Sequence, residues 1–195
     1  MGYKHSREEI LDGAVAVAFD DGLSTLTFGR VANRLGTSDR VVVYYFPSKD
    51  DLISSVLVAL GTRLQATLAQ TLTSHVSSHI ELARIVWPVL AHPDTDPMFA
   101  LFFEANGLAA TGRDPYRSIV PSVVTAWIDW ASELINGDGE QRRAEAEAAI
   151  ALLDGLLLLR QLAGPEAADR AARQLGVNPT SSPRTRAGRP PKPAA

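Results

Sequence analysis

Apolar residues recur at intervals of three and four along most of the chain, the spacing that places them on one face of an α-helix. Residues 7–21 show this pattern, with Ile10, Leu11, Ala14, Val17 and Ala18 on one face. Gly22 follows directly, as expected after a helix. Residues 28–35 repeat the pattern on a shorter scale and end at Gly36. Two consecutive helices are therefore predicted near the N-terminus.

Residues 41–46, with the sequence VVVYYF, are compatible with either a strand or a helix. β-Branched and aromatic residues favour strands. The sequence offers no second strand candidate, however, and a lone strand would leave its backbone groups unpaired. Helix propensities differ by less than about 1 kcal/mol per residue, so packing can override them. We therefore predict a helix over residues 38–45, capped by Ser38 and ended by Pro47, with Ser48 capping a further helix from Lys49.

Beyond about His75 the pattern predicts a body of longer helices, separated by Pro, Gly and Asp. The expected helices cover residues 81–92, 97–110, 115–135, 140–162 and 166–175. The last residues, 177–195, are rich in Pro, Ser and Arg and have no apolar periodicity, so we predict a disordered basic tail. The predicted fold class is all-α.

Composition narrows the possible classes of protein. The 195 residues contain 46% apolar residues and no cysteine, which excludes disulfides and thiolate metal sites. A reducing cytoplasm is the simpler location, and the charged start lacks a secretion signal. The most apolar run, residues 148–159, is shorter than the roughly 20 residues that cross a bilayer. A net charge of −3 argues against non-specific coating of nucleic acid but permits a local basic patch.

The predicted helix over residues 38–45 has chemistry that suits a DNA major groove. Val42 and Phe46 share one face and can pack on the preceding helix. The remaining surface then carries Arg40, Val41, Tyr44 and Tyr45. A guanidinium can bind guanine, phenols can reach phosphates or bases, and valine can contact a thymine methyl group. Lys49 and Thr27, each at the start of a helix, can hold a phosphate.

Residues 7–57 resemble the N-terminal domain of the TetR family of bacterial transcription repressors. The matching segments are ILDGAVAVAFDDG, LTFGRVANRLG, TSDRVVVYYF and PSKDDL, in the family's order and spacing. The resemblance implies a helix-turn-helix DNA-binding head over residues 1–48 and a helical ligand-binding and dimerisation body over residues 49–176. By position, the DNA-facing residues would be Thr27, Ser38, Asp39, Arg40, Val41, Tyr44, Tyr45 and Lys49.

One position departs from the family's pattern. The family usually has a tyrosine, whose hydroxyl contacts phosphate, where this chain has Val43. Either Tyr44 or Tyr45 supplies that hydroxyl here, or the helix lies slightly differently in the groove.

Bulky aromatic side chains gather in the predicted body. They either pack as ordinary core or form the walls of an apolar cavity with a few polar groups to orient a ligand. The resemblance implies a small lipophilic effector, and the expected pocket residues are Trp87, Phe99, Phe102, Phe103, Trp127 and Trp130. The polar candidates are His92, Glu104, Asn106 and Asp129.

Residues 148–162 are apolar almost all round, so a helix there must be buried on several sides. It is either a central core helix or the interface of a homodimer, and the resemblance implies the latter. The expected interface residues are Leu153, Leu156, Leu157 and Arg160, with residues 121–135 as the neighbouring segment. Dimerisation would allow two heads to read a palindrome.

The predicted function is a dimeric transcriptional repressor that a small, largely apolar ligand releases from a palindromic operator. We predict no catalytic residue, cofactor or metal. Two alternatives come from other classes: a helical adaptor that binds proteins, and a metal-dependent all-α enzyme. The enzyme would depend on His75 and His79, which are four residues apart and could share a metal.

Overall fold

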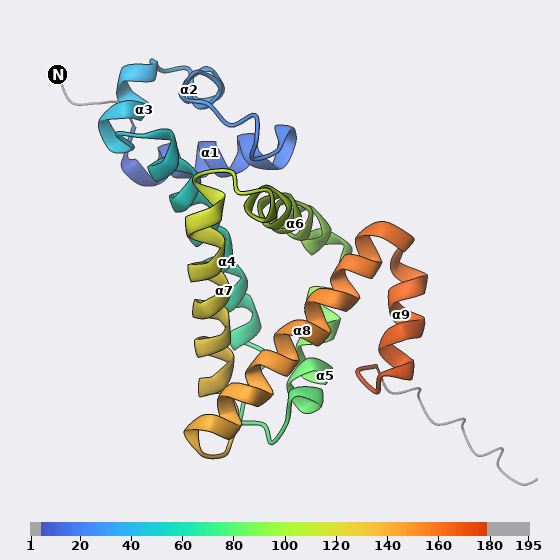
Figure 1. Cartoon of the computed structure of the whole chain (residues 1–195). Helices are drawn as coiled ribbons and strands as arrows, with labels where there is room; N and C mark the ends of the chain where they lie inside the picture. The colour runs from blue at the N-terminus through green and yellow to red at the C-terminus, as the bar shows by residue number, and fades with distance from the viewer. Residues whose placement is uncertain (1–4, 179–195) are drawn as a thin grey trace, which may run out of the picture.

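The structure, a computed structural model, describes residues 5–178 of the chain. This part is all-α (Figure 1), and its only β pairing is an isolated bridge between Val76 and Ile135. The α-helices are α1 (Arg7–Asp21), α2 (Phe28–Leu35), α3 (Asp39–Tyr45), α4 (Lys49–Ala69), α5 (His79–Leu90), α6 (Asp96–Ala110), α7 (Tyr116–Glu133), α8 (Gly139–Ala163) and α9 (Pro165–Gln174). A short 3-10 helix, Pro93–Thr95, precedes α6.

Helices α1 to α3 form a small head, and the predicted helix of β-prone residues is confirmed as α3. Val42 and Phe46 are both fully buried, because they lie on one face and pack into the head's core. The guanidinium of Arg7 lies 4.7 Å over the ring of Phe46. Ser6 caps α1 in a reciprocal capping box with Glu9.

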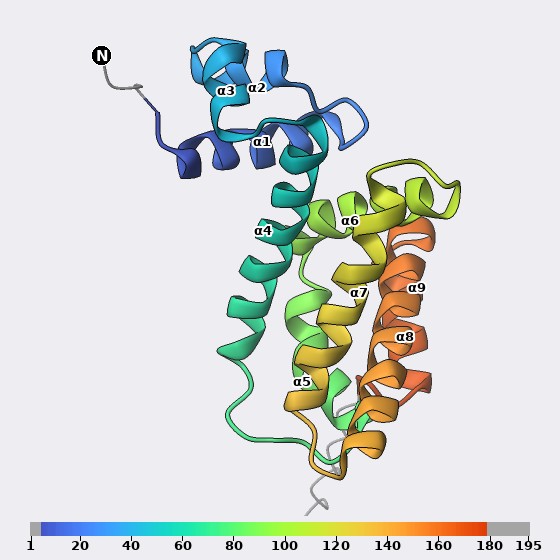
Figure 2. The same ribbon diagram turned by 60° about the vertical axis from the view of Figure 1, so that its left-hand side comes forward.

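Helix α4 leaves the head and runs down into the body (Figure 2). Ser48 caps its start by accepting a hydrogen bond from the Asp51 amide. By length and composition α4 could cross a membrane, a test that the core helix of a soluble protein also passes. Buried apolar residues lie along the helix, from Leu52 near the head to Leu68 in the body, whereas Val58 is 57% exposed.

Helices α5 to α9 form the body, in which α8 packs against α5, α6, α7 and α9. The predicted helices lie within two residues of those observed, and α5 starts earlier than predicted because Ser78 caps it. Helix α7 ends before Ile135, which instead pairs with Val76. Figure 1 shows α7 and α8 in front of α4 and α5.

Two apolar cores hold the described chain together, and they do not divide at the predicted domain boundary. The first contains the head and α4 as far as Leu60, and also takes in Leu101, Ala105 and Tyr116 from the body. The second fills the body from Leu64 onward. The head therefore packs directly on α6 and the start of α7.

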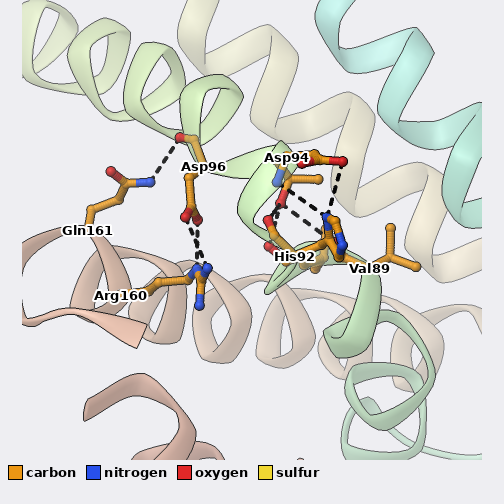
Figure 3. Close-up of polar contacts among 8 residues, drawn as sticks. Val89, His92, Asp94, Asp96, Arg160 and Gln161 are labelled. Atoms are coloured by element: carbon orange, nitrogen blue, oxygen red, sulfur yellow. Dashed lines mark hydrogen bonds and ion pairs between the residues drawn. The ribbon is translucent and has the colours of Figure 1, made fainter. Parts of the chain in front are cut away.

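A bidentate ion pair joins the end of α8 to the start of α6 (Figure 3). The Arg160 Nε and Nη2 atoms donate to the two carboxylate oxygens of Asp96 at 2.6 and 2.9 Å. The side-chain amide of Gln161 donates to the Asp96 carbonyl at 2.9 Å. The neighbouring carboxylate raises the pKa of Arg160 above its ordinary value. The pair fixes the position of α6 against the body.

The predicted tail starts too early. Val177 is buried in the body core, and its amide donates to the Ala172 carbonyl at 2.8 Å. The remainder of that tail, residues 179–195, lies outside the described residues.

Candidate DNA-binding face and ligand cavity

The turn between α2 and α3 fixes how α3 is presented. Gly36 ends α2 in the left-handed conformation, with φ 61°, which glycine adopts without strain. Thr37 then donates its amide to the Ala32 carbonyl at 3.0 Å. The glycine and this hydrogen bond end α2 and turn the chain into α3. Two helices joined by such a short turn form a helix-turn-helix.

The surface of α3 exposes some of the predicted DNA-facing residues more than others. Arg40 and Tyr44 are exposed, the latter to 61% of its surface, and Val43 is exposed to 39%. Val41 and Tyr45 are only partly exposed and pack against the head's core. The Tyr45 hydroxyl donates to the His5 carbonyl at 2.9 Å, and its ring meets the Tyr44 ring edge to face.

The other residues predicted to face DNA surround α3. Thr27 caps α2, its hydroxyl accepting a hydrogen bond from the Arg30 amide. Ser38 occupies the N-cap position of α3, but its side chain forms no capping hydrogen bond. Ser38, Asp39 and Lys49 are exposed. In the described part of the chain, neither Arg40 nor Lys49 forms an ion pair, whereas Arg30 and Arg34 pair with Asp21 and Asp20.

The body encloses an apolar cavity of about 110 Å³, a size on the order of cavities that accept one aromatic ring. Helices α4 to α8 all contribute to its wall. Four of the six predicted pocket residues line it: Phe99, Phe102, Trp127 and Trp130. The two tryptophan rings pack edge to face, with centroids 5.4 Å apart. Trp87, buried in the body core, and Phe103, whose ring packs on Phe102, are outside the lining.

None of the four polar candidates lines this cavity. His92 accepts a hydrogen bond from the Asp94 amide and so caps the 3-10 helix (Figure 3). Asp129 pairs with Arg143 at 3.0 Å. Asn106 has a buried side-chain oxygen without a hydrogen-bond partner. These side chains serve local structure or lie away from the cavity.

The polar group in the cavity wall is Asp154, a single acidic residue within the apolar run of residues 148–159. It lies on α8 between Leu153 and Leu157, which also line the cavity. Burial raises the pKa of Asp154 to about 6. Because the pKa in the folded state exceeds the ordinary value of 3.8, the folded protein favours the protonated side chain. The contribution of Asp154 to the free energy of unfolding is therefore fully present below pH 3.8. That contribution is lost as pH rises through about 6.

Glu104 connects the cavity helix to the head. Its carboxylate oxygens accept the amide hydrogens of Leu23 and Ser24, each at 2.9 Å, in the loop between α1 and α2. The same helix, α6, lines the cavity through Phe99 and Phe102. One rigid element therefore contacts both the cavity and the head.

The residues predicted for the dimer interface lie inside the single chain. Leu153, Leu156, Leu157 and Arg160 are buried within it, at 2–7% exposure, which leaves little of their surface for a partner. They face the cavity, the body core and Asp96. From Ala144 onward the exposed stripe of α8 consists of Ala144, Glu147, Ala151, Gly155, Leu158, Leu162 and Ala163. Local apolar pattern alone could not distinguish burial inside one chain from burial between two.

The described residues contain no group of three or more His, Cys, Asp or Glu residues that could hold a metal ion. His79 instead binds Glu145: its backbone amide and ring Nδ1 lie 2.7 and 2.6 Å from one carboxylate oxygen. These contacts, the backbone hydrogen bond foremost, lower the pKa of Glu145.

Comparison with known proteins agrees with this geometry. Residues 10–56 match the family model of bacterial regulatory proteins, tetR family. Among curated proteins, none matches the chain. A solved transcriptional regulator from Rhodococcus sp. RHA1 is 21% identical with a TM-score of 0.68, covering 89% of this chain and 94% of its own. A TetR regulator from Legionella pneumophila is also 21% identical, with a TM-score of 0.63 and coverage of 90% and 97%.

A third solved protein, the multidrug binding protein EbrR in complex with imidazole, is 22% identical with a TM-score of 0.65. The alignment covers 91% of this chain and 92% of EbrR. At these identities the solved structures establish the fold alone, and the likeness to the family comes from the N-terminal match. Residues 10–56 thus match the tetR family of bacterial regulatory proteins, on a fold that the described chain shares with these solved regulators.

Proposed function

We propose that the protein is a dimeric repressor that a small, largely apolar effector releases from a palindromic operator. The observation that carries this proposal is the position of α6, which contacts the head through Glu104 and lines the cavity through Phe99 and Phe102. A molecule that enters the cavity and shifts α6 would also shift the head. Such a protein acts inside the cell, in the cytoplasm, where its DNA lies.

In this proposal α3 enters the major groove and reads bases through Arg40, with Tyr44 beside it. Tyr44 is the better candidate for the phosphate contact that the family makes from the position of Val43. It is the more exposed of the two tyrosines, while the Tyr45 hydroxyl binds the His5 carbonyl. Thr27 and Lys49 would hold phosphates on either side of the groove.

Replacing Arg40 by alanine should cost about 1–3 kcal/mol of operator binding and relax specificity at one base position. The reason is that a bidentate guanidinium–guanine contact discriminates one base pair from the others. Binding of wild type and variant to single-base operator variants measures both effects.

Lys49→Ala is the matched comparison, because a phosphate contact carries no sequence information. It should weaken binding to every sequence alike and reduce the slope of log affinity against log salt by roughly one. An Arg40 variant that behaved in the same way would show that Arg40 holds a phosphate and does not read a base.

Two heads are needed because one recognition helix reads too few base pairs, and a symmetric dimer places two about 34 Å apart or at a similar groove spacing. The exposed faces of α7 and α8 suit such a dimer. Thr125 and Ala126 on α7 are small, and the α8 stripe contains two exposed leucines, Leu158 and Leu162. Small residues allow close approach of helices, and the leucines supply apolar area.

Glu104→Gln should loosen the link between body and head, because one amide oxygen replaces two charged acceptors. Hydrogen bonds to charged groups contribute about 1.5–3 kcal/mol, so exchange of the Leu23 and Ser24 amides with solvent should quicken about tenfold or more. Hydrogen exchange measures this directly. Glu133→Gln, at the exposed end of α7, is the control and should leave both amides unchanged. Unaltered exchange in Glu104→Gln would show that α6 does not hold this loop.

Selection of bound DNA from a random pool tests the function itself. Recovery of a palindrome with two equal half-sites would support the dimeric regulator. Recovery of no sequence preference would overturn it and favour the protein-binding adaptor.

A further inference from the structure

We propose that the cavity in the body selects a lipophilic cation, whose positive charge binds the carboxylate of Asp154 while its apolar part packs on the aromatic wall. This inference rests on the proposed function and names the chemical class of the effector.

The first support is the isolation of Asp154. The other residues that line the cavity are apolar or glycine, so no side chain in its wall can neutralise the carboxylate. Within residues 5–178 Asp154 forms neither a hydrogen bond nor an ion pair. A carboxylate held among apolar groups without a partner is costly. A bound ammonium or aromatic cation would supply the missing partner and offset that cost.

The second support is the composition of the wall around this charge. Trp127 and Trp130 of α7 and Phe99 and Phe102 of α6 line the same cavity as Asp154. The faces of aromatic rings attract cations, most strongly for tryptophan, and aromatic cages bind quaternary ammonium groups. A neutral lipophilic molecule would gain the apolar contact but would leave the carboxylate desolvated and unpaired. The cavity therefore discriminates by charge as well as by shape.

The third support is the effect of burial on Asp154. Burial raises its pKa to about 6, and a cation bound beside the carboxylate would favour the ionised form and offset this shift.

The test compares cations with neutral molecules of the same shape. Benzylamine and benzyl alcohol form a one-ring pair, and proflavin and acridine form a three-ring pair in which only proflavin is cationic at neutral pH. A change in tryptophan fluorescence, to which Trp127 and Trp130 in the cavity wall contribute beside Trp87, reports binding without DNA. The wild type should bind the cation of at least one pair about ten- to hundredfold more tightly than its neutral partner.

Asp154→Asn should abolish this preference by weakening the cation about ten- to hundredfold, while the neutral partner changes less than about threefold. Asp129→Asn, which removes an exposed carboxylate of α7 outside the cavity, should keep the preference of the wild type. Circular dichroism checks that both variants are folded. Equal affinities for cation and neutral partner in the wild type would overturn the proposal. So would a cation preference that persists in Asp154→Asn, or failure of all four compounds to bind.

Failure of the cation proposal and failure of the proposed function give different results. If neutral compounds bind best and release the selected DNA, the effector-controlled repressor stands and only the charge assignment fails. If cations bind through Asp154 but no palindrome is selected, the cavity assignment stands and the operator proposal fails.

Discussion

Leu158→Glu should convert the proposed dimer into monomers and abolish tight operator binding. Leu158 lies on the exposed stripe of α8 and is itself 41% exposed, so it offers apolar area to a partner. In a two-fold symmetric dimer each substitution occurs twice in one interface. Losing the burial of two leucines costs about 4 kcal/mol, equivalent to roughly a thousandfold weaker dimerisation. The two new carboxylates would also repel each other.

Light scattering after gel filtration gives the oligomeric state, and binding to the selected palindrome gives the functional loss. Leu175→Glu is a matched control, since Leu175 is 50% exposed but lies after α9, outside α7 and α8. It should remain dimeric. A Leu158→Glu protein that stays dimeric at low concentration would move the interface to another surface.

Arg160→Met should lower the free energy of unfolding by about 3 kcal/mol, because it leaves the Asp96 carboxylate without its partner. The guanidinium side chain is 6% exposed, and both of its hydrogen bonds to Asp96 are charge-assisted. We expect the lower end of the range for broken buried pairs, since the Asp96 side chain is 37% exposed. The helix dipoles also stabilise the pair, because the Asp96 anion lies at the start of α6 and the Arg160 cation lies in the last turn of α8.

Arg143→Met provides the control for this effect. Arg143 also links α8 to an aspartate on another helix, Asp129 of α7, but both side chains are at least 50% exposed. Its loss should change stability by less than about 1 kcal/mol. Denaturant unfolding followed by circular dichroism compares the two variants. Asp96→Asn combined with Arg160→Met should cost less than the sum of the single changes. Similar small losses for both arginines would mean that burial adds nothing to this pair.

The helices of the head were predicted from the sequence nearly to the residue, because glycine, proline or a capping residue stands at their ends. Gly22 and Gly36 end α1 and α2, and Ser48 starts α4. The strand propensity of residues 41–46 was correctly set aside, since Val42 and Phe46 gain more by filling the head's core. In the body the predicted helix ends differ from the observed ones by one or two residues, as at α5, which Ser78 caps two residues before the predicted start.

The site was predictable only in part. Aromatic residues at helical spacing indicated a cavity wall, and four of six lie there, but spacing along one helix does not tell which neighbour each ring faces. The same limit led Leu156 and Arg160 to be assigned to a dimer interface, although their partners lie within the chain. The sequence does carry a signal for Asp154. It is the only acidic residue within the apolar run of residues 148–159, and a buried carboxylate is costly unless a partner neutralises it.

The first apolar core has a consequence for how the protein unfolds. Leu101, Ala105 and Tyr116 of the body fill space among the head's own residues, so the head lacks part of its interior when it is alone. Head and body should consequently melt as one cooperative unit, and a mutation that softens α6 should weaken the DNA-reading end without touching it.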